Sequence, residues 1–328
     1  MVGGRALRRS RGVVVRVAAV DCGTNSVRLL IADIADIADT AREANEPVDI
    51  ERRMEIVRLG QGVDRTGRLA PEALERTFTA MRSYAKLIAE HAGPSGWMPV
   101  RVVATSATRD ASNRSEFVAG VTEIFGVEPE VVTGEEEARL SFTGATRGQD
   151  TGEPPYLVVD IGGGSTEFVV GSGAVEGALS VDIGCVRLTE RHLKADPPEP
   201  ETVEAAIADI EAAMDRVEAV VPVRDARTLV GLAGSVTTVS GIALGLPAYD
   251  PARIHHSRIP AAQVHEVSAR LLEMTREERA AIPVMHPGRV DVIGAGALIL
   301  DRIVRRYGFA EVVVSEHDIL DGIAWSLV

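Results

Sequence analysis

Cysteine is scarce in this chain, and long apolar runs are missing. The two cysteines, Cys22 and Cys185, lie beside glycine turns and have no partners at metal-ligand spacing, so we expect reduced, packed thiols. No apolar run approaches the ~18 residues of a membrane-spanning helix. Residues 1–12 are basic, but they lack the apolar core and the cleavage site of a signal peptide. We therefore expect a cytoplasmic protein that does not bind membranes.

Positive charge is in deficit. The chain has 35 lysines and arginines against 48 aspartates and glutamates, a formal net charge of −13. This balance argues against a general nucleic-acid or membrane-surface binder, because such proteins present a basic surface. A polyanionic substrate is still compatible with it, since backbone amides, a few arginines and a bound metal ion form a local anion site. Such a site must then appear as a local motif.

Length and residue pattern predict an α/β protein of two domains. The 328 residues exceed the roughly 250–300 at which one hydrophobic core stops growing. Strand-like and helix-like segments alternate along the chain, which is typical of α/β folds. Residues 148–155 are rich in glycine and proline and are the best linker candidate. The clearest strands are expected at 15–21, 27–34, 50–59, 156–161, 166–171, 175–181 and 228–234, and the clearest helices from Pro71 to about 91 and at 114–125, 185–194 and 201–219.

An internal similarity links the two halves. Around Asp21 and Asp160 the chain follows one plan: an apolar strand, the aspartate, one residue, a glycine, small polar residues and a second strand. The offset is 160 − 21 = 139 residues, which is far too long for a solenoid repeat. The pattern fits two domains of similar fold that face each other, each contributing one hairpin to a shared cleft.

The residue types in these two turns suit phosphate. A glycine-rich turn exposes backbone N–H groups that hold phosphate oxygens, and an aspartate at the strand end is well placed to hold a divalent cation. One such turn alone also describes an ordinary tight hairpin, but the duplicated pair with matched aspartates favours a phosphate clamp. The expected phosphate-binding residues are Gly23, Thr24, Asn25 and Ser26 in the first turn and Gly162, Gly163, Gly164 and Ser165 in the second.

A third glycine-rich turn follows the strand that begins at 228 and opens a helix. Backbone amides at a helix start form an anion site, so Gly234 and Ser235 join the phosphate-binding candidates. The chain contains no P-loop motif, and the surroundings of this turn make a poor dinucleotide-binding fingerprint.

Two phosphate-type hairpins and a later glycine turn resemble the superfamily of actin, hexokinase and the acetate and sugar kinases. The segments "ATSATRDASN" at 104–113, "TGEEEARLSFTGA" at 133–145 and "VVDIGGGSTEFVVG" at 158–171 resemble more closely the exopolyphosphatase and guanosine-pentaphosphatase (Ppx/GppA) family. Further matching segments run from 18–30 to 288–300, so the resemblance covers nearly the whole chain. The chain looks like the short, two-domain form of actinobacterial exopolyphosphatases, without the extra C-terminal domain of long members.

The resemblance implies an α/β, duplicated actin-like (ribonuclease H-like) fold of two domains with an interdomain cleft. It implies an N-terminal domain at 1–134 and a C-terminal domain at 135–315. The final helix, about 316–328, is expected to pack back on the first domain.

The resemblance also assigns roles to individual residues. Glu137 matches the catalytic base of the family, and Asp160 and Glu167 match acids important for metal binding and activity. Asp21 joins them as a metal candidate because it lies at the end of the strand before the first glycine turn. We expect Mg²⁺ or Mn²⁺ as the cofactor. Arg109 suits a bidentate contact to a phosphate oxygen, and Arg187 is a weaker candidate of the same kind.

Ordinary structural roles stand beside these assignments. Acidic residues at 135–137 favour a helix N-terminus in any protein. Arg109 taken alone is typical of a solvated surface residue. Glu167 is harder to explain structurally, since a charge flanked by apolar strand residues is costly unless it has a partner.

The resemblance implies an exopolyphosphatase that releases orthophosphate from the end of inorganic polyphosphate, acts as a homodimer and does not bind nucleic acid. Three alternatives stay open. One is a phosphohydrolase for guanosine pentaphosphate (pppGpp), a nucleotide of the stringent response. The others are an ATP-dependent phosphotransferase and a non-catalytic sensor that binds polyphosphate or ppGpp.

Overall fold

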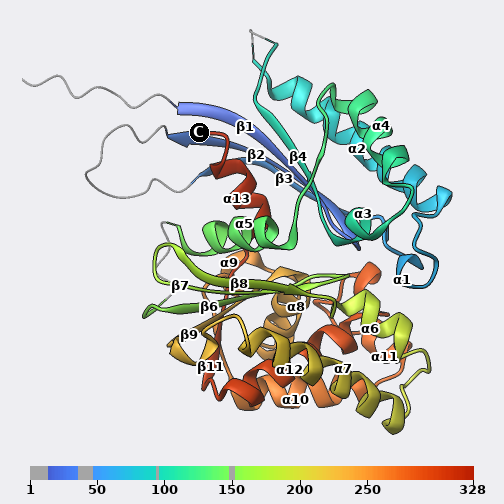
Figure 1. The fold of residues 1–328 in the computed structure, drawn as a ribbon, viewed down its shortest axis with the longest axis vertical. Helices are drawn as coiled ribbons and strands as arrows, with labels where there is room; N and C mark the ends of the chain where they lie inside the picture. The colour runs from blue at the N-terminus through green and yellow to red at the C-terminus, as the bar shows by residue number, and fades with distance from the viewer. Residues whose placement is uncertain (1–13, 36–46, 94–95, 148–151) are drawn as a thin grey trace, which may run out of the picture.

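The computed structural model describes residues 14–35, 47–93, 96–147 and 152–328. Two mixed β-sheets organise this part of the chain, one in each half (Figure 1). The first sheet lies in the upper part of Figure 1 and the second in the lower part, with helices α5 (Gly134–Thr146) and α13 (Ile319–Trp325) between them.

The first sheet has the strand order β3-β2-β1-β4-β5. Its first three strands pair antiparallel as a meander, and β4 and β5 then add in parallel on the other side of β1. The bounds are β1 Val14–Cys22, β2 Ser26–Ala35, β3 Val48–Ile56, β4 Val100–Ala104 and β5 Glu130–Val131.

The second sheet repeats this plan in the order β8-β7-β6-β9-β11, with β10 added at the edge. Strands β6, β7 and β8 form the antiparallel meander, and β9 and β11 add in parallel. The bounds are β6 Tyr156–Ile161, β7 Thr166–Gly171, β8 Val175–Val181, β9 Thr228–Leu232, β10 Arg258–Pro260 and β11 Glu311–Val314. The repeated order confirms the predicted duplicated α/β fold.

Amphipathic helices cover the outer faces of both sheets. In the first half, the apolar side of α2 packs on β2 in a core that includes Leu74, Met81 and Tyr84. In the second half, α7, α8, α10 and α12 bury a larger core around β6 and β9. The remaining helices of the described residues are α1 Val63–Thr66, α2 Pro71–His91, α3 Ser106–Asp110, α4 Arg114–Phe125, α6 Cys185–Arg191, α7 Pro200–Glu218, α8 Ala233–Ala243, α9 Pro251–Ile254, α10 Ala261–Glu273, α11 Arg276–Ala280 and α12 Ile293–Tyr307.

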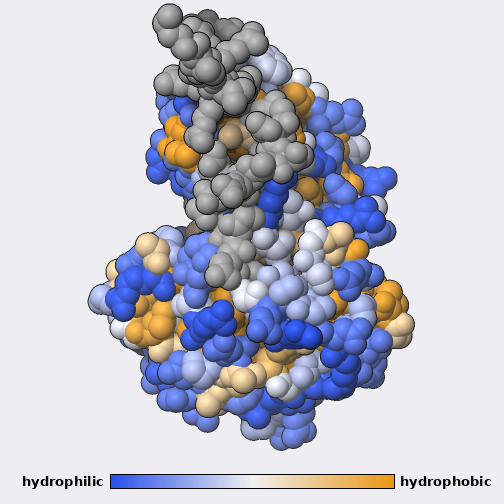
Figure 2. Space-filling view, turned by 90° about the vertical axis from the view of Figure 1, so that its left-hand side faces the viewer, coloured by the Kyte–Doolittle hydropathy of each residue, from blue (hydrophilic) through white to orange (hydrophobic). Residues whose placement is uncertain are grey.

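The surface agrees with the composition. On the face shown in Figure 2, hydrophilic residues dominate and apolar residues are scattered in small groups. No helix in the described ranges combines the length and the apolar character that a membrane crossing requires.

Two inner helices join the halves. Helix α13 packs on the first sheet, where Ile319 and Ile323 share a core with Val17 and Leu30 of β1 and β2. Helix α5 packs on the second sheet, where Phe142 belongs to a separate core with residues of β6, β7 and β9. Since α5 and α13 also contact each other, they form the packed layer between the sheets.

Glycines allow α5 and α13 to cross closely. A Cβ on Gly144 would lie 1.8 Å from the backbone oxygen of Asp318, and one on Gly322 would lie 2.0 Å from the backbone oxygen of Leu140. These are backbone contacts, which cannot turn aside as a flexible side chain can. The crossing therefore requires glycine at both positions.

Most expected elements are present, with shifts at their ends. The strand expected to reach 234 ends at Leu232, because α8 begins at Ala233 with the positive φ of 68°. The helix expected at 185–194 ends at Arg191. Of the expected linker at 148–155, residues 148–151 lie outside the described residues. The predicted domain boundary after 134 stays a prediction.

The glycine crossing generates a stability prediction. We expect Gly144→Ala to lower the free energy of unfolding by about 1–3 kcal/mol, because the added methyl forces the two helices apart. Gly294→Ala in α12 is the matched control, since its nearest neighbour would lie at an ordinary 3.5 Å. Alanine there should be neutral or stabilising through its better helix propensity. Chemical denaturation of both variants checks this, and equal effects would contradict the crossing as the cause.

Candidate active site

A polar cavity lies between the two halves, and all three predicted glycine turns line it. Its volume is about 100 Å³. The predicted residues in its wall are Asp21, Gly23, Thr24, Asn25, Ser26, Glu137, Asp160, Gly162, Gly163, Ser165, Gly234 and Ser235. Three predicted residues lie outside the wall: Arg109, Gly164 and Glu167.

The first two turns have the same geometry. The N–H of Gly23 donates to the carbonyl of Ser26 at 2.9 Å, and the N–H of Gly162 donates to the carbonyl of Ser165 at 3.0 Å. Each turn connects two antiparallel strands, β1 with β2 and β6 with β7. The duplicated motif therefore forms a duplicated structure, with one copy on each side of the cavity.

The two turns touch each other beside the cavity. A Cβ on Gly164 would lie 2.5 Å from Oγ of Ser106 and 2.7 Å from Oγ1 of Thr24. These two hydroxyls also share a hydrogen bond of 2.9 Å. Gly164 thus lies at the contact between the halves, where only a glycine fits.

Three buried carboxylates face one another across the cavity. Asp21, Glu137 and Asp160 all line it and are at most 7% exposed. Burial raises the pKa of Glu137 to about 7, and the neighbouring Arg109 only partly offsets this. Burial likewise raises the pKa of Asp160 to about 7, with a further contribution from the charge of Asp318. Because these carboxylates interact, ionisation of one opposes ionisation of the others.

Glu137 is held at the first turn of α5. The helix begins after Thr133, whose hydroxyl accepts a hydrogen bond from the N–H of Glu136 at 3.2 Å. Arg109 donates from Nη1 to Oε2 of Glu137 at 3.0 Å and to the carbonyl of Val132 at 2.9 Å. The structure thus places Arg109 beside the predicted base rather than in the cavity wall, which leaves one oxygen of Glu137 outside this ion pair.

Glu167 is buried behind the cavity wall. It stands directly opposite Asp160 in the β6–β7 ladder and is 1% exposed. Ser180 donates to its Oε1 at 2.7 Å. Burial, together with the charges of Glu137 and Asp160, raises the pKa of Glu167 well above its usual range. Among the described residues, Glu167 thus accepts a hydrogen bond from a hydroxyl, and the charges that act on it come from acids rather than from a cation.

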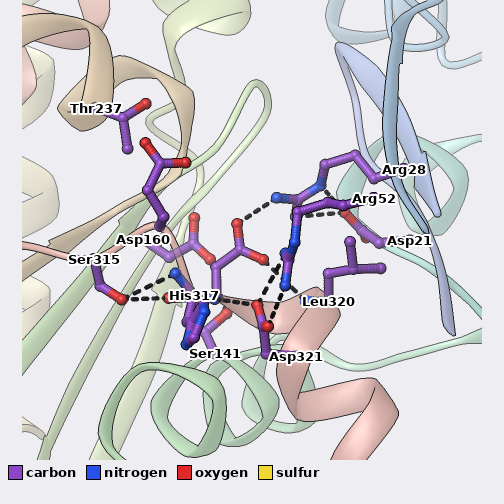
Figure 3. A network of polar contacts seen from close by, with 12 residues as sticks. Asp21, Arg28, Arg52, Ser141, Asp160, Thr237, Ser315, His317, Leu320 and Asp321 are labelled. Carbon is purple, nitrogen blue, oxygen red and sulfur yellow. Dashed lines mark hydrogen bonds and ion pairs between the residues drawn. The ribbon is translucent and has the colours of Figure 1, made fainter. Parts of the chain in front are cut away.

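Sequence reasoning missed three charged residues of the site: Arg28, Asp318 and Arg289. Arg28 stands opposite Asp21 in the β1–β2 ladder and donates to its Oδ2 at 2.7 Å (Figure 3). It also pairs with Asp318, the N-cap of α13. Arg28 had a signal, since it stands in the otherwise apolar stretch 27–32 of β2, much as Glu167 stands among apolar residues in β7. Asp318 had none, because it meets Arg28 across 290 residues of chain.

An arginine, Arg289, packs against the third glycine turn. The guanidinium of Arg289 lies over Gly234, where a Cβ would be 2.3 Å from Cζ, and it lines the cavity. Its Nη1 donates to Oγ1 of Thr238 at 3.3 Å. Arg187, the weaker phosphate candidate, lies outside the cavity wall.

The acids fit a divalent cation that keeps water and substrate ligands. No ready-made group of three metal-binding side chains occurs within the described ranges. Oδ1 of Asp21, however, is buried without a hydrogen-bond partner there, and Asp160 is the second carboxylate in the wall. Mg²⁺ is often bound by one or two carboxylates together with phosphate oxygens and water, and these residues match that pattern.

Comparison with known proteins identifies the family. Residues 34–328 match the model of the Ppx/GppA phosphatase family. Exopolyphosphatase 2 of Mycobacterium tuberculosis (strain ATCC 25618 / H37Rv) is 50% identical over 323 residues, which cover 96% of this chain and 99% of that protein.

Solved structures agree as well. A crystal structure of an exopolyphosphatase-like protein is 42% identical with a TM-score of 0.88, covering 95% of this chain and 97% of that one. The PPX-GPPA enzyme of Aquifex aeolicus is 33% identical with a TM-score of 0.78, covering 96% of this chain and 100% of that one. The match to the family model includes Glu137, the second glycine turn and the third, and the relatives cover nearly the whole chain. This chain therefore belongs to the Ppx/GppA phosphatase family.

Proposed function

We propose that this protein is an exopolyphosphatase, which hydrolyses the terminal phosphoanhydride of inorganic polyphosphate and releases orthophosphate. The observation that carries the proposal is the cavity itself. Two equivalent glycine turns, one from each half, line it together with three buried carboxylates. The name of the Mycobacterium tuberculosis relative supports the same substrate class.

The residues of the cavity suit phosphoanhydride hydrolysis. Backbone amides and hydroxyls of the turns bind phosphate oxygens, and this positioning is most of what phosphoryl transfer needs from a protein. Glu137 orients the attacking water and accepts its proton on a carboxylate oxygen. A pKa of about 7 suits a base that must ionise near neutral pH. Arg109 holds Glu137 in place through the 3.0 Å ion pair.

Mg²⁺ or Mn²⁺ is the proposed cofactor. When bound, the ion would neutralise negative charge on the phosphate oxygens. Asp21 and Asp160 would hold it. Glu167 stands opposite Asp160 in the ladder but outside the cavity wall, so we assign it an electrostatic influence on the metal site rather than a direct contact with the ion.

A second candidate activity, hydrolysis of guanosine pentaphosphate, is favoured by a chamber beside the cavity. The chamber has a volume of about 520 Å³ and shares Arg28, Gly234 and Arg289 with the cavity. Tyr249 and Met285 belong to its partly apolar wall. Such a wall suits a nucleoside whose phosphates reach the glycine turns.

Three broader properties stay proposals. The family resemblance supports a homodimer and a domain boundary after residue 134, and the residue pattern of the N-terminal segment supports a cytoplasmic location. Light scattering on the purified protein tests the oligomeric state.

Phosphate release tests the proposed function. With Mg²⁺, we expect release from tripolyphosphate and longer polyphosphate, and Glu137→Gln should lower kcat by about 10²-fold or more because a general base is lost. Binding of tripolyphosphate should change little, since glutamine keeps the shape of the side chain. The same assay with pppGpp and ATP ranks the second candidate. Tight binding without turnover in the wild type would instead support a sensor.

The pH profile tests the role of Glu137. The ionised form is the active base, so kcat/KM should rise with pH and level off at or below about 7, as a bound cation lowers the raised pKa. Arg109→Gln removes a charge that lowers this pKa, so the rising limb should move to higher pH. The position of the limb, not the absolute rate, is the readout. An unmoved limb would show that another group controls the profile.

Asp160→Asn tests both the metal site and the cost of the buried acids. The Mg²⁺ concentration for half-maximal activity should rise about tenfold or more. Burial raises the pKa of Asp160 to about 7, so the native state is destabilised as pH rises from the unfolded pKa toward 7. Asparagine does not ionise and so removes this destabilisation. The melting temperature of the variant should therefore exceed that of the wild type above about pH 7 and equal it near pH 4. Glu153→Gln, at an exposed acid, serves as the control.

A further inference from the structure

Arg187 connects three segments through one side chain. It lies on α6, and its side chain is only 11% exposed. Its Nε donates to the carbonyl of Gly164 at 2.6 Å, its Nη1 to Oδ1 of Asp64 at 2.5 Å, and its Nη2 to Oδ2 of Asp110 at 2.6 Å. These four residues are called the Arg187 cluster below. The planar guanidinium suits this task, because it presents donors in several fixed directions.

Each acceptor belongs to a segment that builds the phosphate cavity. Gly164 is part of the second glycine turn. Asp64 lies on α1, shortly after Gly60, whose N–H donates to the carbonyl of Thr24 in the first turn at 2.8 Å. Asp110 ends α3, whose first residue lines the cavity. One side chain of the second half thus holds its own turn and two segments of the first half.

The start of α6 also orients the second turn. The N–H groups of Cys185 and Val186 donate to the carbonyls of Gly162 and Gly163 at 3.0 and 2.9 Å, and Arg187 binds the next carbonyl, that of Gly164. In a trans peptide, the N–H points opposite to the C=O. Three successive carbonyls directed at α6 therefore direct the following three N–H groups away from it, which is the arrangement that an anion site requires.

Further charged contacts between the halves surround the Arg187 cluster. Arg191 donates from Nε to Oδ2 of Asp64 at 2.8 Å. The carboxylate of Glu190 accepts from the N–H of Gly62 at 3.0 Å. Arg58 pairs with Asp291 at 2.9 Å. These contacts are more exposed than Arg187, so solvent screens them more strongly.

We propose that Arg187 is a positioning residue that keeps the two glycine turns in contact and the cleft closed. Both turns can bind the same phosphate chain only while Thr24 and Gly164 are in contact. The Arg187 cluster joins the two halves beside this contact. This inference deepens the proposed function, on which it rests for its substrate, but the closed arrangement is a property of the protein alone. Lysine cannot replace Arg187, because one ammonium group cannot reach three acceptors in fixed directions.

Solution scattering and hydrogen exchange of the substrate-free protein test the arrangement. Arg187→Gln and the double variant Asp64→Asn/Asp110→Asn should both increase the radius of gyration. Both should also speed amide exchange in residues 162–165. The double variant is informative because it leaves the contact from Arg187 to Gly164 intact. Arg187→Lys should behave like Arg187→Gln. If Arg187→Lys instead kept the wild-type radius of gyration and amide exchange, positive charge alone would be sufficient at this position, and the proposal would be overturned.

Arg306→Gln is the matched control. Arg306 is 17% exposed and pairs with Glu211, Asp215 and Glu218, all within the second half. Its loss should lower the melting temperature without changing the radius of gyration. An unchanged radius and unchanged exchange in the Arg187 and double variants, with a lower melting temperature alone, would make Arg187 merely structural and overturn the proposal.

Kinetics with tripolyphosphate complete the test. If Arg187→Gln leaves about a tenth of the molecules closed, KM should rise about tenfold while kcat at saturation changes less, because substrate must first select the closed form. An unchanged KM in a folded variant would contradict the proposal. Failure of the proposed function has a different signature: the wild type would release no phosphate from any polyphosphate, while scattering and exchange would still decide the role of Arg187.

Discussion

The structure depends on holding several carboxylates close together while they are buried from solvent. Asp21, Glu137, Asp160 and Glu167 are all nearly buried, and burial is the largest cause of the raised pKa of each. The duplicated hairpins treat their acids differently. In the first, Asp21 stands opposite Arg28; in the second, the equivalent partner of Asp160 is Glu167. The first hairpin thus pairs its acid with a cation, whereas the second places another acid opposite its own.

This difference makes chemical sense for a phosphatase. A buried carboxylate oxygen without a hydrogen-bond partner, such as Oδ1 of Asp21, is available to a metal ion, and the raised pKa of Glu137 suits a group that accepts a proton. Each acid becomes less costly to the fold once such a ligand binds. Buried acids without enough compensating positive charge lower the stability of the folded state, as active sites often do. The raised pKa values express that cost, because they measure how strongly the folded chain resists ionisation of these groups.

Close backbone contacts between α5 and α13 fix the positions of the acids that these helices carry. Helix α5 carries Glu137, and α13 begins at Asp318, the partner of Arg28. The two helices cross at Gly144 and Gly322 with almost no room between their backbones. Since α5 packs on one sheet and α13 on the other, this crossing links the position of the predicted base to the first glycine turn.

Much of the fold and of the cavity could be predicted from local sequence. Glycine turns, strand-end aspartates and helix starts depend on backbone preferences and on periodicity within a few residues, and the predicted residues of the three turns, apart from Gly164, line the cavity accordingly. The choice of Glu137 came from the family resemblance, and Glu137 also lines the cavity. The tertiary structure alone decided the partners of the long charged side chains. Arg109 binds Glu137, Arg28 meets Asp318, and Arg187 holds Asp64 and Asp110. The physical reason is reach: an arginine selects acceptors according to how separate segments close around it, and no local pattern contains that information.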